Sequence, residues 1–125
     1  MCGRFSLYTD IEKIKEQFKI QNSDSIPNNF NIAPTEAALC ILNTEKGREA
    51  IQMRFGIKPW YSKNNNSILL NARIETVAEK PAFKQSLKYR RCLIIMNGFF
   101  EWQHHQTDKK IVKQPFTSAV KTPDF

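Results

Sequence analysis

Apolar residues near the start of the chain recur at the spacing of an amphipathic helix. Ile14 and Phe18 lie four positions apart, with charged and polar residues between them. Thr9 followed three residues later by Glu12 has the spacing of a capping box, in which each side chain bonds a backbone N–H at the helix start. The pattern therefore predicts a helix over residues 10–20 with one apolar face.

The polar stretch that follows predicts a long loop. Residues 21–35 are rich in Asn and Ser, and Pro27 and Pro34 exclude a regular helix. Phe30 and Ile32 are apolar, and we expect them to anchor the loop to the core. Long loops inside compact domains are often functional.

Apolar runs predict strands in the middle of the chain. Residues 37–43 and 50–55 flank the turn-like sequence TEKGRE and predict a β-hairpin. Residues 67–72 (SILLNA) predict a buried strand. The end of that strand would deliver two polar side chains, Asn71 and Arg73.

The second half of the chain predicts a short helix and a second hairpin. Proline suits the first position of a helix, which favours one over residues 81–87. Residues 90–105 contain two β-rich runs separated by Asn97 and Gly98, a pair typical of a tight hairpin turn. On the second run, Glu101 lies among aromatic residues.

The last segment predicts one more strand over residues 110–116, whereas residues 117–125 show neither a period nor a partner. Taken together, these elements predict an α+β, sheet-dominated fold with short helices. The length of 125 residues suits a single domain with one core.

Composition narrows the class of protein. No apolar run approaches the roughly 20 residues that span a bilayer, so we expect a cytoplasmic protein without a membrane partner. The three cysteines, Cys2, Cys40 and Cys92, include no Cys-x-x-Cys pair, which argues against a zinc ribbon or a disulfide framework. Cys40 and Cys92 lie in apolar runs and are interpreted as core thiols.

Positive charge is concentrated in the second half. The net charge is +7, and residues 63–125 carry eleven basic and five acidic side chains. A basic stretch comprises Lys80, Lys84, Lys88, Arg90 and Arg91. Such a stretch can neutralise the phosphates of a nucleic acid, although a basic stretch on a helix is more often a solvated face.

Cys2 offers distinctive chemistry. If Met1 is removed, Cys2 presents an α-amine beside a thiol, with ordinary pKa values of about 8 and 8.5. The amine can condense with an aldehyde to an imine, and the thiolate can then close a five-membered thiazolidine ring. An internal cysteine cannot do this. The alternative interpretation is a terminal cysteine without a role.

Other candidate residues each have two interpretations. Glu101 can be a proton donor and acceptor or an exposed strand residue. Asn71 and Arg73 can hold a polar substrate or a phosphate, or they can cap a loop. His104 and His105 are neighbours on a strand and point to opposite faces, so we expect no metal site. Trp60, Phe99 and Trp102 can stack on unpaired bases or pack in the core.

Five motifs occur in an order that resembles the SOS response-associated peptidase (SRAP) family. They are MCGRFSL at the start, NFNIAPT at 29–35, FGIKPW at 55–60, NARIET at 71–76 and RRCLIIMNGFFEW at 90–102. The resemblance covers residues 1 to about 115. It implies a monomeric protein without a cofactor that binds abasic sites in single-stranded DNA during the DNA damage response, and is nucleoid-associated when bound.

The resemblance also implies roles for individual residues. Cys2 would be the nucleophile that forms a covalent DNA–protein crosslink, after the protein removes its own Met1 by a peptidase activity. Asn71 would position the terminus or the sugar, and Glu101 would be the acid–base group of a lyase-like ring opening. The implied DNA contacts are Arg4, Trp60, Arg73 and Trp102.

The sequence also departs from the family pattern. Phe55 stands where the family usually has tryptophan, and Asn97 stands in place of the aspartate of an alanine-aspartate-glycine turn. The later histidine-arginine-methionine-proline stretch, which carries the family's catalytic histidine, has no counterpart. We therefore expect a partial SRAP domain over 1–115, incomplete at its C-terminal side, and a divergent tail over 116–125. A hydrolytic cysteine peptidase and a non-catalytic DNA-binding fragment are the alternatives.

Overall fold

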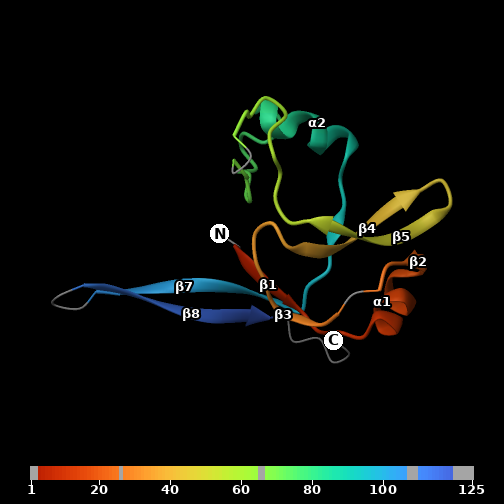
Figure 1. Ribbon diagram of the computed structural model, residues 1–125, viewed down its shortest axis with the longest axis horizontal. Coiled ribbons are helices and arrows are strands. Elements are labelled where there is room, and N and C mark those ends of the chain that lie inside the picture. Colours follow the sequence, from red (N-terminus) through yellow and green to blue (C-terminus); the bar gives the residue numbers. More distant parts are fainter. Residues whose placement is uncertain (1–2, 26, 65–66, 107–109, 120–125) are drawn as a thin grey trace.

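A computed structural model describes residues 3–25, 27–64, 67–106 and 110–119 (Figure 1). In this part of the chain the elements are β1 (Arg4–Leu7), α1 (Ile11–Phe18), β2 (Ile20–Ser23), β3 (Asn29–Ile32), β4 (Ala37–Thr44), β5 (Gly47–Arg54), α2 (Pro81–Tyr89), β6 (Leu93–Ile94), β7 (Gly98–Gln106) and β8 (Ile111–Ala119). The predicted sheet-dominated α+β fold with short helices is confirmed. Neither described helix is long and apolar enough to cross a membrane.

The strands form two four-stranded sheets. The first has the order β3-β1-β7-β8 and is antiparallel throughout. The second has the order β2-β5-β4-β6, in which only the β2–β5 pair is parallel. Figure 1 shows the long β7–β8 hairpin extending away from the second sheet.

One apolar core joins the two sheets and α1. Its largest fully buried side chains are Phe5, Ile14, Ile32 and Leu39. The Phe5 ring meets Phe55 edge-to-face at 5.2 Å between centroids. Edge-to-face pairs add to the stability that burial alone provides. The ring at position 55 therefore packs in the core, although it is not the tryptophan of the family pattern.

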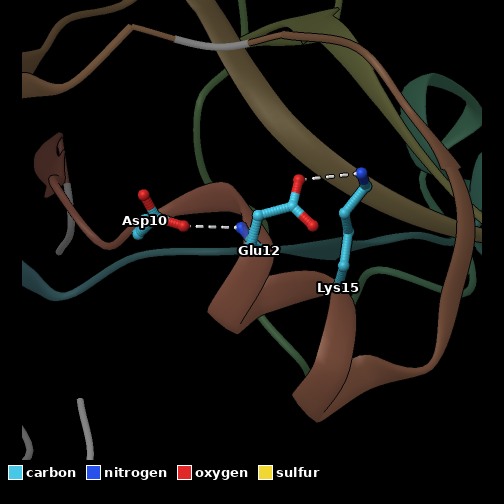
Figure 2. A network of polar contacts seen from close by, with 3 residues as sticks. All are labelled: Asp10, Glu12 and Lys15. Atoms are coloured by element: carbon cyan, nitrogen blue, oxygen red, sulfur yellow. Dashed lines mark hydrogen bonds and ion pairs between the residues drawn. The ribbon is translucent and has the colours of Figure 1, made fainter.

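The predicted first helix is confirmed as α1, but it ends at Phe18, because Ile20 already belongs to β2, and its N-terminal cap differs. Asp10, rather than Thr9, is the N-cap, and its Oδ1 accepts a hydrogen bond from the backbone N–H of Glu12 at 2.8 Å. Figure 2 shows this bond beside the Lys15–Glu12 ion pair at 3.0 Å. A carboxylate at this position also favours the helix because it interacts with the positive end of the helix dipole.

Two loop and strand predictions were wrong. Residues 21–35 contain most of β2 and all of β3 rather than one long loop. Ile32 is buried as expected, whereas Phe30 is 65% exposed. Residues 67–72 form no strand and contribute one isolated bridge, between Leu69 and Ile57. Short strands of four residues depend on partners that are distant in sequence, so periodicity alone identifies them poorly.

The predicted hairpin at Asn97 and Gly98 was also wrong, because the two β runs enter different sheets. β6 pairs with β4, whereas β7 pairs with β1 and β8. At the start of β7 the backbone passes close to β8, and a Cβ on Gly98 would lie 2.9 Å from the backbone oxygen of Ser118. This close approach of the two strands favours glycine at position 98. The hairpin over 37–55 and the helix that begins at Pro81 are confirmed. β8 is confirmed too, but it continues through residues 117–119, which were expected to lack a partner.

Asn97 joins the end of β1 to the start of β7. Its Oδ1 accepts hydrogen bonds from the backbone N–H groups of Tyr8 (2.7 Å) and Thr9 (3.2 Å), and its Nδ2 donates to Thr9 Oγ1 at 2.6 Å. Aspartate offers the same two acceptor bonds, and the Thr9 hydroxyl can rotate to donate to a carboxylate. This geometry explains why asparagine can stand where the family pattern has aspartate.

We expect Asn97→Ala to lower the free energy of unfolding by about 1–3 kcal/mol, because it leaves part-buried polar groups without partners. Asn97→Asp is the matched control and should lose less than half as much. Urea denaturation of the three proteins measures both values. Equal losses in the two variants would show that the backbone bonds to Oδ1 do not stabilise this junction.

Candidate functional site

The site predicted from the motifs is centred on the start of β1, where this strand lies beside β7. Arg4 is opposite Phe100, and Phe5 is opposite Phe99. Directly opposed residues share a face of a sheet, and successive residues alternate between faces. Glu101 therefore shares the core-facing side with Phe5 and Phe99, whereas Arg4 lies on the opposite side together with Phe100.

Arg4 is half-buried and held in place by the NFNIAPT motif. Its Nη1 donates to Asn31 Oδ1 at 3.1 Å, across the pair formed by β1 and β3. Asn31 in turn lies in an Asx turn, because its backbone N–H donates to Asn29 Oδ1 at 2.9 Å. The residues predicted for the site do not include Asn31, although the NFNIAPT motif that contains it is a signal in the sequence.

Glu101 is half-buried on β7, opposite Phe116 of β8. It lies two residues beyond Phe99, which packs against the core. Glu101 thus lies just beyond the core residue Phe99 on the same face of β7, beside Phe116, which is itself 47% exposed. In this position a carboxyl group is close to apolar side chains and still reachable from outside.

Asn71 and Arg73 lie on a different segment and are exposed. This segment follows Leu70, which packs against the same core as Phe99. The Arg73 carbonyl accepts hydrogen bonds from the backbone N–H groups of Thr76 (3.1 Å) and Val77 (2.9 Å), which fixes a turn. Within the described ranges, neither the Asn71 nor the Arg73 side chain bonds to β1 or β7.

The two tryptophans differ in exposure. Trp60 is 82% exposed and meets Tyr61 edge-to-face at 5.5 Å between centroids, whereas Trp102 is 36% exposed on β7. The loop with Trp60 is closed by the bridge at Ile57 and starts at Gly56, whose φ of +113° favours glycine. A large exposed ring on a closed loop is suited to stacking on an unpaired base.

One exposed aromatic pair was not predicted. The rings of Tyr8 and Phe30 stack at 5.4 Å between centroids, with 17° between their planes, and both are well exposed. They lie at the opposite end of β1 from Arg4, because β1 runs from Arg4 to Leu7.

Cys2 lies outside the described residues. His104 and His105 are exposed on β7, opposite Lys113 and Val112 of β8 respectively. In the part of the chain that the structure describes, no three His, Cys, Asp or Glu residues are grouped so as to hold a metal ion.

The other two cysteines are not equivalent. Cys40 is a buried core thiol, as predicted, but Cys92 is exposed, so its prediction was wrong. Cys92 comes just before β6, an edge strand of two residues, and is therefore left uncovered. Burial raises the pKa of the Cys40 thiol from 9.0 to about 12, and the nearby Cys92 thiol contributes to this rise through its charge and a hydrogen bond.

We expect this thiol to make the stability of the protein fall above pH 9. The unfolded Cys40 ionises near pH 9 while the folded thiol keeps its proton up to about pH 12, so rising pH favours the unfolded state between these values. The contribution is at most about 1.4 kcal/mol per pH unit. Urea denaturation at pH 8.5 to 10.5 should show a shallower pH slope for Cys40→Ala than for the wild type. Parallel slopes would contradict the burial of this thiol.

Comparison with known proteins places these features in a family. The sequence profile described as "SOS response associated peptidase (SRAP)" matches residues 1–124. The abasic site processing protein YoaM of Bacillus subtilis is 34% identical over 116 residues, which are 89% of this chain and 51% of that protein. The abasic site processing protein HMCES of Mus musculus is 30% identical, covering 93% of this chain and 40% of the relative.

A solved structure shares the fold. The crystal structure of a phage-related protein from Bordetella bronchiseptica superposes with a TM-score of 0.77 at 22% identity, covering 93% of this chain and 54% of that one. The chain thus spans about half the length of the relatives it matches.

Proposed function

Because the chain belongs to the SOS response associated peptidase family, we propose that it binds abasic sites in single-stranded DNA and forms a covalent crosslink to the sugar through Cys2 after loss of Met1. Relatives in bacteria and in mouse carry the name abasic site processing protein. Removal of Met1 by the chain itself would be the peptidase activity of the family name.

The observation that carries the proposal is the register of β1 and β7. Arg4 lies opposite Phe100, the residue before Glu101. Arg4, Phe5 and Ser6 belong to the motif that contains Cys2, and Gly98, Phe99 and Phe100 belong to the motif that contains Glu101. The β1–β7 pair therefore brings the two motifs side by side, which supports a reaction that uses a residue from each.

The reaction balances with one water released. The open-chain form of an abasic deoxyribose is an aldehyde, and the Cys2 amine adds to its carbonyl carbon to give a carbinolamine. Protonation and loss of the hydroxyl as water give an iminium ion, and attack of the Cys2 thiolate on the iminium carbon closes a thiazolidine whose nitrogen keeps its proton. Glu101 would donate the proton that lets the hydroxyl leave, as a general acid.

The remaining residues would hold the DNA. Arg4 and Arg73 would contact phosphates on either side of the lesion, because guanidinium groups bind phosphate oxygens through fixed pairs of donors. Asn71 would hold the sugar or the reacting amine through its side-chain amide. Trp60 and Trp102 would stack on the neighbouring bases.

The proposal is tested with an oligonucleotide that carries one abasic site. We expect a heat-stable adduct whose mass is that of the protein without Met1 plus the DNA minus one water, with the link mapped to Cys2. An oligonucleotide with all bases intact is the control and should give none. A protein of verified N-terminal Cys2 that forms no adduct would overturn the proposal, and a purely hydrolytic peptidase would give that result.

A further inference from the structure

A second feature of the molecule lies away from β1 and β7. A pocket of about 570 Å³ opens between the end of α1, the β4–β5 hairpin and the segment that joins α2 to β6. Its lining includes Arg48, Lys88, Tyr89 and Arg91, together with Phe18 and Cys92. Small-molecule sites typically have volumes of about 300–1,000 Å³, so a nucleotide is of suitable size.

The pocket is positively charged. Among the residues that the structure describes, its lining contains three cationic side chains and no carboxylate. Within the described residues, Arg48, Lys88 and Arg91 form no ion pair. Arg48 donates from Nη1 to the Phe18 carbonyl at 2.9 Å, which fixes its side chain against α1. Like charges gathered without partners repel each other, and an anion relieves that repulsion.

An aromatic ring lies within the same pocket. Tyr89 is 67% exposed, and the Lys88 ammonium lies 5.0 Å from its ring centroid. The Lys88 ammonium is attracted to the face of the Tyr89 ring. An exposed ring can also stack on a base. The pocket thus combines groups that bind a phosphate with a ring that binds a base.

The cationic residues continue outward along α2. Lys80, Lys84 and Lys88 are spaced by four residues, so they follow one side of the helix over about 12 Å. All three are exposed. A free nucleotide would occupy the pocket alone, whereas a stripe of this length is matched by the successive phosphates of a strand.

We propose that the pocket formed by Arg48, Lys88, Tyr89 and Arg91, with the basic side of α2 leading to it, binds a phosphate and a base of a single DNA strand at a distance from the lesion. The choice of single-stranded DNA as the polyanion rests on the proposed function. The pocket itself rests on the geometry and charge of residues that the crosslinking step does not use.

The experiment measures the affinity of the full chain for a fluorescent oligonucleotide without an abasic site over a range of salt concentrations. The slope of log K against log salt is about −0.7 for each phosphate contacted in single strands. The double variant Lys88→Gln/Arg91→Gln should bind roughly tenfold more weakly at low salt, with a slope reduced by about 1.4. Both side chains are exposed, and thermal melting verifies that the variant is folded.

A variant with the same loss of charge provides the control. Lys13→Gln/Lys113→Gln removes two exposed lysines, on α1 and β8, that do not line the pocket. It should keep the wild-type slope. Tyr89→Leu should weaken binding roughly tenfold without changing the slope, because stacking releases no counterions.

The outcomes separate this site from its rivals. An unchanged slope in the Lys88/Arg91 variant, an equal loss in the control, or no binding by the wild type would overturn the proposal. Binding of dAMP as tight as that of the oligonucleotide would show a free-nucleotide site instead. This DNA has no lesion, so the measured affinity does not depend on crosslinking. If the protein fails to crosslink abasic DNA, the salt slopes still support the pocket. If the protein crosslinks abasic DNA but the Lys88/Arg91 variant keeps the wild-type slope, only the pocket proposal is overturned.

Discussion

Replacing Cys2 by alanine is expected to abolish the covalent adduct with abasic DNA. The variant keeps an α-amine after loss of Met1 and can still form an imine, but it has no thiolate to close the ring. An imine hydrolyses in water, so no heat-stable product should accumulate. Denaturing gels and intact mass measure the product, and the intact-base oligonucleotide sets the background.

Cys2→Ser is the matched variant for this prediction, because it separates the roles of nitrogen and sulfur. A serine hydroxyl is a poorer nucleophile than a thiolate at neutral pH. We expect little heat-stable adduct from it, and a clear adduct when borohydride is added to reduce the imine to an amine. A heat-stable adduct from Cys2→Ala without borohydride would show that another residue links the DNA.

Glu101→Gln is expected to slow adduct formation by roughly 10²- to 10⁴-fold, the usual contribution of a positioned general acid or base. The amide has nearly the same shape as the carboxyl group but does not transfer a proton. Glu101 shares a face of β7 with Phe99, so a change of side-chain volume there could disturb packing. Glutamine occupies nearly the same volume as glutamate, so Glu101→Gln should leave the fold intact. Single-turnover rates at saturating DNA measure the effect on the chemical step.

The control for Glu101 is Glu79→Gln, an exposed glutamate in the turn before α2. It has the same change of charge and should crosslink at the wild-type rate. The affinity of Glu101→Gln for DNA should match the wild type within about threefold, because a carboxylate does not attract phosphates. A rate within about twofold of the wild type would remove Glu101 from the chemical step.

These two predictions concern different parts of the same reaction. Cys2 supplies the atoms that bond to the sugar, whereas Glu101 would move a proton. The pocket lined by Tyr89 takes part neither in the bond to the sugar nor in the proton transfer. Its loss should lower the affinity of the protein for DNA while the rate of adduct formation at saturating DNA stays unchanged. The separate measurements of rate and affinity therefore assign each residue to one step.

Local pattern predicted the elements whose stabilising contacts are close in sequence. The helix at residues 11–18 depends on the spacing of Ile14 and Phe18, and the helix from Pro81 depends on the fixed φ of proline. The hairpin of β4 and β5 closes through a short turn. The motifs around Arg4, Asn71 and Glu101 likewise indicated a family that the sequence profile confirms.

Other features depend on residues that meet only in the folded chain. Asn97 and Gly98 have the local preference for a hairpin, yet β6 and β7 find their partners in β4 and β1, which lie far earlier in the chain. β2 and β3 are each four residues long, too short for a clear period, and exist because β5 and β1 complete their hydrogen bonds.

By itself, the sequence determined the short-range elements, the family and the candidate chemistry of Cys2. The tertiary structure decided which sheet each strand enters, that Cys92 is exposed while Cys40 is buried, and that Arg48 meets Lys88 and Arg91 around one pocket. The physical reason is the range of the interactions involved. Helix periodicity and turn preference act over a few residues, whereas strand pairing, burial and charge clustering depend on residues that only the complete fold brings together.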